Sequence, residues 1–231
     1  MNFKYSMRLT ALGLSFIFVF FAVAHLTDMR TDTAVFSYDV KKTAPTVVID
    51  PGHGGADGGA VSDSGILEKD VNLQIAQRIA ALYKTMGVSC ILTRNEDIML
   101  NGDETEHKKL HDLKSRVQIA RNTENCIFLS IHQNKFPQKQ YKGLQVYYSK
   151  HDPASEIIAE KIQSAVRNEL QPYNTRQIKQ ATSAIYVLDN LQCPAVLVEC
   201  GFLSNDEETS YLISDEYQKA LSALIAVNAL G

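Results

Sequence analysis

Tryptophan is absent from the 231-residue chain, proline occurs only six times, and neither sign of charge dominates. The 23 basic and 26 acidic residues give a net charge of −3, and no basic face with interleaved aromatic residues occurs. This pattern argues against nucleic-acid binding. No internal repeat is visible. The composition, 45% hydrophobic and 21% charged, is that of an ordinary globular protein, and the length indicates one domain.

Charge is also missing from residues 9–26, which follow two basic residues at the start of the chain. A basic start followed by an apolar core is typical of a signal sequence, and Ala22-Val23-Ala24 offers a small-residue cleavage site. The apolar run of about 18 residues is also close to the length that spans a bilayer, so an uncleaved anchor is the alternative. Residues 1–26 therefore predict export across the cytoplasmic membrane, and the polar residues 27–44 predict a linker.

The four cysteines, Cys90, Cys126, Cys193 and Cys200, show no CxxC spacing and so no common metal or redox motif. Cys193 and Cys200 bracket one apolar run, and on an extended strand they would stand about 23 Å apart, too far to pair. Export permits other disulfides, but unpaired cysteine is also common in protein cores. We expect buried free thiols.

Hydrophobic patterning predicts short apolar strands that alternate with amphipathic helices. The expected strands are Thr46–Asp50, Val88–Leu92, Cys126–His132, Gly143–Tyr148, Ile185–Leu188 and Ala195–Glu199. The expected helices are Glu68–Tyr83, Leu113–Ala120, Pro153–Leu170, Asp206–Ile213 and Asp215–Leu230. The polar stretch 95–111 is expected to be a mobile loop. The alternation predicts a single α/β domain with a mostly parallel, twisted sheet of about six strands and helices on both faces.

A glycine-rich loop with a single histidine follows the first expected strand. Five glycines, at positions 52, 54, 55, 58 and 59, surround His53. Their spacing fits neither GxGxxG nor GxxxxGK[ST], the common phosphate-binding loops. Glycines let backbone, ligand or metal approach closely, and α/β folds bind ligands at the carboxyl ends of their strands. His53 is therefore a candidate for chemistry, although a purely structural strand-end histidine is the simpler alternative.

Three more ionisable residues are expected near His53. His132 and Glu199 end two predicted strands, and Glu68 opens the first helix at the far end of the glycine loop. If these strands are parallel neighbours, the side chains converge on one edge of the sheet. Two histidines and one carboxylate are the ligands of many catalytic zinc sites, in which the metal lowers the pKa of its bound water toward about 7.

The two glutamates suit different roles in such a site. Glu68 lies beside the His53 loop and is the better ligand, whereas Glu199 lies between an apolar strand and a tight turn. Partial burial there would raise the pKa of Glu199 and suit it to proton transfer. Alternatives stay open: Glu68 is also explained as an acid at a helix N-terminus, and His107 with His111 has the i,i+4 spacing of a rival metal site.

Four ordered blocks of the sequence resemble the signature of one enzyme family. The blocks are Ile49–Gly55 (IDPGHGG), Glu68–Leu73 (EKDVNL), Ser130–Asn134 (SIHQN) and Val198–Asn205 (VECGFLSN). They look like those of the zinc-dependent N-acetylmuramoyl-L-alanine amidases, the amidase_3 family, over residues 46–230. The resemblance implies that residues 45–231 form a zinc amidase catalytic domain acting on peptidoglycan glycan strands and stem peptides. It implies hydrolysis of the amide between the N-acetylmuramic acid lactyl group and L-alanine.

The resemblance also assigns roles to individual residues. It implies that His53, Glu68 and His132 bind Zn²⁺ and that Glu199 is the catalytic acid and base. Beyond what the resemblance implies, we expect Asp57 to orient a ligand histidine, as zinc sites commonly require, and Asn134 and Arg116 to contact glycan or peptide. For Asp57, Asn134 and Arg116, loop-capping and surface polar roles explain the sequence equally well.

The short build and the segment Leu110–Arg116 are similar to the spore-cortex amidases of endospore formers, the CwlD type. This implies a part in muramic δ-lactam formation during cortex maturation, or more broadly in cell-wall remodelling outside the cytoplasmic membrane. Lys135 departs from the small residue that many relatives carry after His-x-Asn, which bears on substrate preference. Only a short segment separates Asn134 from the next strand, so we expect no helical insert that blocks the site.

Two other functions remain open on the sequence alone. One is a non-catalytic peptidoglycan-binding module, and the other is a zinc carboxypeptidase that acts within the stem peptide. Dependence on an activating partner protein is a further open question. No nucleic-acid partner is expected, and membrane contact is expected only through the N-terminal segment.

Overall fold

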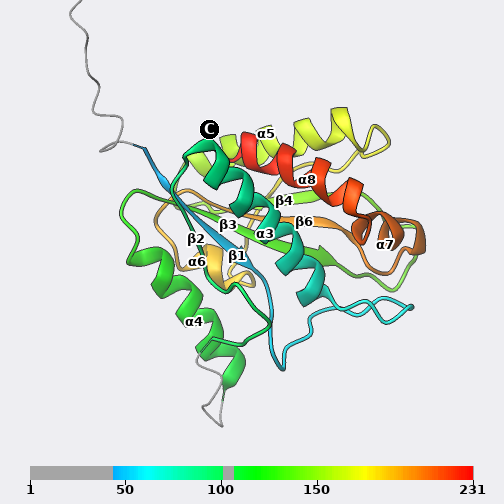
Figure 1. Ribbon diagram of the computed structural model, residues 1–231, viewed down its shortest axis with the longest axis horizontal. Coiled ribbons are helices and arrows are strands. Elements are labelled where there is room, and N and C mark those ends of the chain that lie inside the picture. Colours follow the sequence, from blue (N-terminus) through cyan, green and yellow to red (C-terminus); the bar gives the residue numbers. More distant parts are fainter. Residues whose placement is uncertain (1–43, 101–106, 231) are drawn as a thin grey trace, which may run out of the picture. The chain divides into compact units, whose positions relative to one another are not determined.

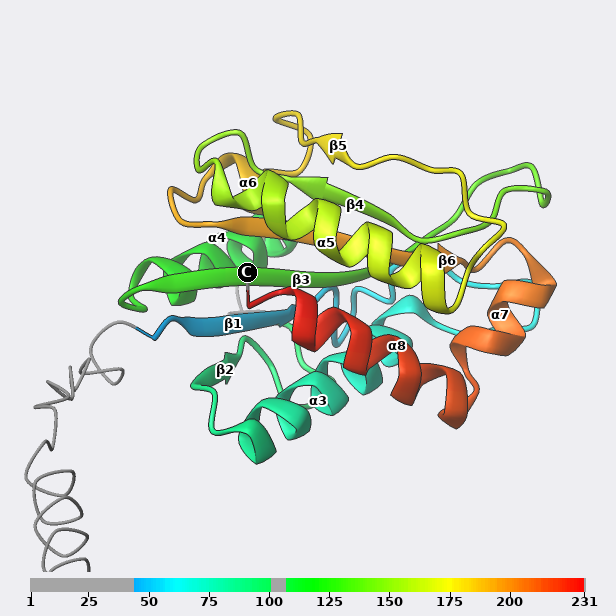
Figure 2. The ribbon, with the colours of Figure 1, turned by 90° about the horizontal axis from the view of Figure 1, so that it is seen from above.

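The apolar runs of the sequence form the centre of the sheet (Figure 1). Its six strands follow the order β2-β1-β3-β6-β4-β5 (Figure 2). The strands are β1 (Thr46–Pro51), β2 (Cys90–Leu92), β3 (Cys126–Asn134), β4 (Gln145–Tyr148), β5 (Lys179–Gln180) and β6 (Ala195–Phe202). β2, β1, β3 and β6 are parallel, β4 is antiparallel to β6, and β5 is parallel to β4. β1, β3 and β6 are buried along most of their length, which explains why their sequences are almost continuously apolar.

Helices cover both faces of this sheet (Figures 1 and 2). They are α3 (Glu68–Met86), α4 (Lys108–Arg121), α5 (Ala154–Glu169), α6 (Tyr186–Asp189), α7 (Asp206–Leu212) and α8 (Asp215–Asn228). α3, α5 and α8 share one hydrophobic core with one face of the sheet, and α4 and α6 share a second core with the other face. Alternate residues of each strand therefore enter different cores, as the two-residue period of a strand requires.

The packing of α3 brings its first residue to the site. Val71, Ile75 and Ile79 repeat at helical spacing and are at most 2% exposed. Burying each such side chain stabilises the fold by about 1.5–3 kcal/mol. Gly87 adopts a left-handed conformation with φ 70° and ends the helix. The buried stripe fixes α3 against β1 and β3, so that Glu68 lies at the carboxyl edge of these strands.

The described residues confirm the expected fold: one α/β domain, a mostly parallel sheet of six strands, and helices on both faces. The strand expected at Ile185–Leu188 is wrong, because Ile185 is the N-cap of the short helix α6 and the other three residues belong to that helix. Its apolar run is too short to show a period that separates strand from helix. The sixth strand is instead the two-residue β5. The expected loop 95–111 is also partly wrong, since α4 already begins at Lys108.

The computed structural model describes residues 44–100 and 107–230. The expected signal segment, residues 1–26, and residues 27–43 of the expected linker lie outside the described residues. Within the described part of the chain, no helix is both long and apolar enough to span a membrane.

Candidate metal and catalytic site

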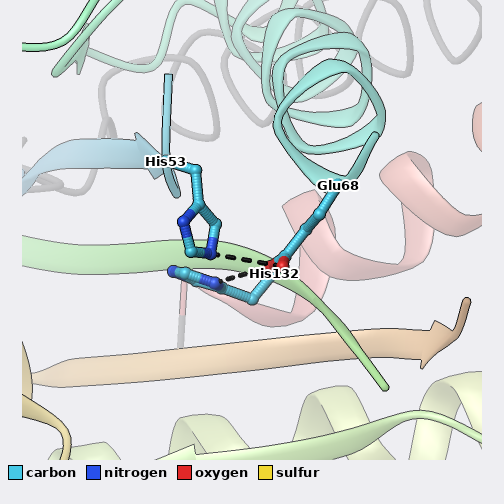
Figure 3. Close-up of side chains that lie close together, drawn as sticks. All are labelled: His53, Glu68 and His132. Atoms are coloured by element: carbon cyan, nitrogen blue, oxygen red, sulfur yellow. Dashed lines mark hydrogen bonds and ion pairs between the residues drawn. The ribbon is translucent and has the colours of Figure 1, made fainter. Parts of the chain in front are cut away.

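The four residues singled out by the sequence meet at the carboxyl edge of the sheet. His53 follows β1, His132 and Glu199 lie near the ends of β3 and β6, and Glu68 begins α3. β3 and β6 pair in register, so that His132 stands directly opposite Glu199. Figure 3 shows His53 and His132 turned toward the carboxylate of Glu68. The parallel arrangement of β1, β3 and β6 thus brings together residues that are far apart in the sequence.

His53, Glu68 and His132 are close enough to share one metal ion. Nε2 of His53 lies 3.2 Å from Oε2 of Glu68, and Nδ1 of His132 lies 2.9 Å from Oε1. One ligand atom from each of the three residues lies within 4.8 Å of the others. Within residues 44–100 and 107–230, no other group of three histidine, cysteine, aspartate or glutamate side chains meets this condition. Two imidazole nitrogens and one carboxylate suit zinc and leave a coordination position for water.

The Glu68 carboxylate is held in place by backbone and side-chain donors. Ala60 N donates to Oε2 at 2.7 Å, while Gln133 N and Asn72 Nδ2 donate to Oε1 at 3.0 and 3.4 Å. Burial by itself raises the pKa of Glu68, but hydrogen bonds from His132 and His53 outweigh it and hold the pKa far below its usual value. Glu68 is therefore ionised and presents a negative charge between two imidazoles, an environment that favours a cation.

His53 is held in an unusual backbone conformation. Its φ of 62° lies in the left-handed region, which a non-glycine residue rarely occupies and which often marks functional sites. Nη2 of Arg116 donates to its carbonyl oxygen at 2.7 Å. Its Nδ1 lies 2.9 Å from Oδ2 of Asp57, so Nε2 points toward Glu68. Burial opposes charge on the ring, but the Glu68 and Asp57 carboxylates outweigh it and raise the pKa of His53.

Two glycines of the loop make room for the site itself. A Cβ atom at Gly52 would stand 2.2 Å from Cε1 and Nε2 of His132. At Gly59, where φ is 68°, it would stand 2.5 Å from Oε2 of Glu68 and 2.7 Å from Cδ2 of His53. These glycines therefore allow the chain's own ligating side chains to approach one another. Gly58, in the same loop, has only an ordinary contact with Leu67 at 3.5 Å.

Glu199 lies beside the cluster but is not one of its three members. Its Oε2 is buried and has no hydrogen-bond partner among the described residues. Burial raises the pKa of Glu199 to about 7; the Glu68 charge adds to this shift, and His132 opposes it. A carboxyl group with such a pKa exchanges protons readily near neutral pH.

Arg116 is buried where the end of β1, α4 and the His53 loop meet. It is 1% exposed, and its five N–H groups are all used. Nη1 donates to Asp50 Oδ1 at 2.7 Å and to Pro51 O at 2.8 Å. Nη2 donates to His53 O at 2.7 Å and to Asp112 Oδ1 at 3.2 Å. Nε donates to Asp112 Oδ2 at 2.7 Å. Arg116 thereby fixes the end of β1 and the backbone of His53. It also borders the pocket beside the cluster, so its contact with substrate stays a prediction.

A pocket of about 240 Å³ opens between the cluster and the α4 and α6 side of the sheet. His53, His132 and Glu199 line one side of it. The other walls include Lys109, Leu113, Ile185, Tyr186 and Val187. Asn134, the other residue expected to contact substrate, is half-buried two residues beyond His132 and does not line this pocket. The rival pair of His107 and His111 lies at the start of α4 and is not part of the three-residue cluster.

Several residues of the site were not singled out from the sequence. Asn72 lies one helical turn after Glu68 and bonds both its carboxylate and the carbonyl oxygen of Gly52, at 3.4 and 3.2 Å. Its place in the block Glu68–Leu73 and its i,i+4 spacing from Glu68 were the available signals. Lys109 and Tyr186 reach the pocket from α4 and α6, and nothing in their sequence neighbourhood connects them with His53.

The mostly parallel fold thus carries, at the carboxyl edge of its sheet, a candidate metal centre of two histidines and a glutamate. The family model for N-acetylmuramoyl-L-alanine amidase, Amidase_3, matches residues 47–229, and the chain belongs to this family. This confirms the resemblance read from the four sequence blocks.

Individual relatives are consistent with this assignment. The chain is 35% identical over 182 residues to the germination-specific N-acetylmuramoyl-L-alanine amidase of Bacillus subtilis, covering 78% of this chain and 76% of that protein. It is also 35% identical to the B. subtilis amidase LytC, of which it spans 34%. The CwlD amidase of Clostridioides difficile, solved in complex with the GerS lipoprotein, superimposes with a TM-score of 0.75 at 35% identity, covering 80% of this chain and 95% of that one.

Proposed function

We propose that this chain hydrolyses the amide bond between the lactyl group of N-acetylmuramic acid and L-alanine of the peptidoglycan stem peptide. His53, Glu68 and His132 would hold a zinc ion, and Glu199 would transfer protons. The observation that carries the proposal is the convergence of these four residues at one edge of the sheet in a chain of the amidase family. Relatives of this family are named N-acetylmuramoyl-L-alanine amidases, and that name specifies the same amide bond.

The three-residue cluster fits a zinc ion by the chemistry of its donors. It offers one ring nitrogen from each histidine and the ionised carboxylate of Glu68. Asp57 contacts the other ring nitrogen of His53, Nδ1. Such a carboxylate fixes the ring orientation and increases the basicity of the ligand nitrogen. A bound zinc ion would supply an activated water at neutral pH and positive charge beside the scissile carbonyl.

Glu199 is placed to move the protons of the reaction. It lies opposite His132 on the neighbouring strand, and its buried Oε2 has no hydrogen-bond partner among the described residues. As a base, Glu199 would take a proton from the attacking water. As an acid, it would return that proton to the departing nitrogen of L-alanine. Its separation from the ligand set leaves the carboxyl group available for both steps.

The pocket beside the cluster suits a substrate with both apolar and anionic parts. Ile185, Tyr186 and Val187 of the α6 segment form a largely apolar wall, and Lys109 of α4 adds a cationic group. Nζ of Lys109 lies 3.3 Å from Oδ2 of Asp57, and its side chain is largely exposed. We propose that the stem peptide lies along this wall, with Lys109 near one of its carboxylates.

The biological setting is proposed from the relatives. One relative of similar length is named as germination-specific, and the CwlD relative also shares 35% of its sequence with this chain. We therefore propose cortex peptidoglycan as the substrate in spore-forming cells, with export directed by residues 1–26.

A protein partner is also part of the proposal. The C. difficile relative was solved in complex with the GerS lipoprotein. We propose that this chain, too, reaches full activity with a partner protein. Purified chain that turns over cortex fragments as fast alone as in an extract of sporulating cells would contradict this part and leave the amidase proposal intact.

The bond that is cleaved is tested by mass spectrometry of muropeptides treated with the purified protein. Amidase action yields a glycan with a free lactyl carboxyl group and a peptide that begins with L-alanine. Loss of a C-terminal amino acid from an otherwise intact muropeptide would indicate a carboxypeptidase, and an unchanged substrate would indicate a binding module. Glu199→Gln should abolish the products, whereas Glu207→Gln, an exposed acid on α7, serves as the matched control.

A further inference from the structure

Two of the four cysteines contact each other at the edge of the sheet away from the metal cluster: Cys126 begins β3, and Cys193 lies two residues before β6. The pairing of β3 with β6 aligns Phe128 with Ala195, and Phe128 N donates to the carbonyl oxygen of Pro194 at 2.8 Å. Two residues earlier in the same register, Cys126 stands beside Cys193. Pro194 has no N–H group, so the ladder of hydrogen bonds between the two segments ends there, although the segments remain adjacent.

The distance between these positions suits a disulfide. Neighbouring strands lie about 4.8 Å apart, and disulfide-linked residues have Cα separations of about 4.4–6.8 Å. Cys126 is buried in the core that also contains Phe128, and Cys193 packs against that same core. Both cysteines line one surface hollow, which gives a small reagent access to the pair.

The two thiols also differ in a way that suits stepwise oxidation. Hydrogen bonding to Cys126 lowers the pKa of the half-buried Cys193, and the same contact, with burial, raises the pKa of the buried Cys126. Cys193 is thus the more accessible and more easily ionised thiol, which makes it the first to react.

The remaining cysteines provide an internal comparison. Cys90 Sγ donates to the carbonyl oxygen of Ala80 at 3.9 Å, and Cys200 Sγ donates to that of Val198 at 3.8 Å. Burial raises the pKa of both thiols. All four cysteines are free thiols in this structure; Cys126 and Cys200 are buried, as expected, whereas Cys90 and Cys193 are only half-buried.

We propose that Cys126 and Cys193 form an intramolecular disulfide by exchange with a small-molecule disulfide of the glutathione type. The Cys193 thiolate attacks one sulfur of oxidised glutathione, which forms a mixed disulfide and releases one glutathione thiolate. The Cys126 thiolate then attacks the Cys193 sulfur and displaces the second glutathione. Two electrons pass from the protein thiols to glutathione, and the two thiol protons go to the released thiolates or to solvent.

The position of the bond determines its effect. It would tie the start of β3 to the segment that joins α6 to β6, where Arg121 Nη2 also bonds the carbonyl oxygen of Asn190 at 2.7 Å. A bond that closes a long loop limits the unfolded chain and stabilises the folded one. His132 and Glu199 lie near the other ends of these strands, so the disulfide should raise the melting temperature and leave turnover unchanged.

The test uses the purified full chain, incubated with oxidised glutathione and then digested without reduction for mass spectrometry. We expect one cross-linked peptide pair containing Cys126 and Cys193, two thiols fewer by titration, and a melting temperature several degrees higher that dithiothreitol reverses. Cys193→Ser should abolish all three effects, and Cys90→Ser should retain them. Four titratable thiols after oxidation, a lasting mixed disulfide on Cys193, or a different pairing would overturn the proposal.

Discussion

The Arg116 side chain connects three parts of the chain that meet under the candidate site. Its guanidinium group lies between Asp50 at the end of β1 and Asp112 on α4, and it also bonds the backbone of His53. Both carboxylates are at most 5% exposed. Buried charges of this kind are stable only while each has its partner. The sequence showed Arg116 as one polar residue on a helix, and its distant partners could not be inferred from local pattern.

Replacing this arginine should destabilise the fold strongly. Arg116→Ala leaves the buried Asp50 and Asp112 without their cation, which should lower the free energy of unfolding by about 3–5 kcal/mol. Lys114→Ala on the exposed side of the same helix should change it by less than about 0.5 kcal/mol. Urea denaturation measures both. A loss below about 1 kcal/mol for Arg116→Ala would contradict the role assigned to it.

Asp50 should make the free energy of unfolding depend on pH. Burial opposes its charge, but Arg116 together with hydrogen bonds from Thr93 and Ser130 lowers the pKa of Asp50 below 3.8. A carboxyl with a lowered native pKa stabilises the fold above its unfolded pKa, and this stability is lost as pH falls through the native value. The stability difference between wild type and Asp50→Asn should therefore be largest near pH 7 and shrink below about pH 4. Urea denaturation across this range measures it, and a constant difference would contradict the assignment.

At the scale of the elements, the glycine loop after β1 is shaped by the side chains that it must accommodate. Gly52→Ala would force a methyl group against the His132 ring, where a Cβ would stand 2.2 Å away. We expect a folded protein with at least a tenfold loss of zinc affinity and of turnover, as for other changes that misplace a ligand. Gly58→Ala, in the same loop without a clash, should retain both. Zinc titration distinguishes the variants, and equal affinities would refute this account of the loop.

The element predictions succeeded where a long pattern was available. The strands β1, β3 and β6 are apolar because both faces are covered, and α3, α5 and α8 carry continuous helical stripes. The short elements failed for the opposite reason. The single turn of α6 has no visible period, and β5 exists only because its two residues pair with β4. The antiparallel direction of β4 likewise follows from tertiary pairing with β6.

At the scale of the whole molecule, the sequence predicted which residues meet but not how they are supported. The convergence of His53, Glu68, His132 and Glu199 followed from strand ends in a parallel sheet, and the structure brings them together. The pocket walls on α4 and α6 were not predicted. These two helices cover one face of the sheet, whereas α3 covers the other face. Such contacts depend on the packing of distant elements, which one sequence does not specify.

Metal binding should stabilise the whole domain. A ligand that binds only the folded state raises the free energy of unfolding, by about 2.7 kcal/mol at a concentration one hundred times its Kd. Adding zinc to chelator-treated protein should therefore raise its melting temperature, and His53→Ala should lose this response. Differential scanning calorimetry measures the shift. An equal shift in His53→Ala would indicate that zinc binds elsewhere.

The central claim is that three residues hold the metal while Glu199 performs the proton transfer. Zinc content per chain, measured beside turnover of a muramoyl-L-alanyl peptide, tests both halves in wild type, His132→Ala and Glu199→Gln. We predict that Glu199→Gln keeps its zinc and loses at least about a hundredfold in turnover, because general acid–base catalysis contributes that much or more. His132→Ala should lose both zinc and turnover. A Glu199→Gln protein with full activity, or a His132→Ala protein with full zinc content, would contradict the claim.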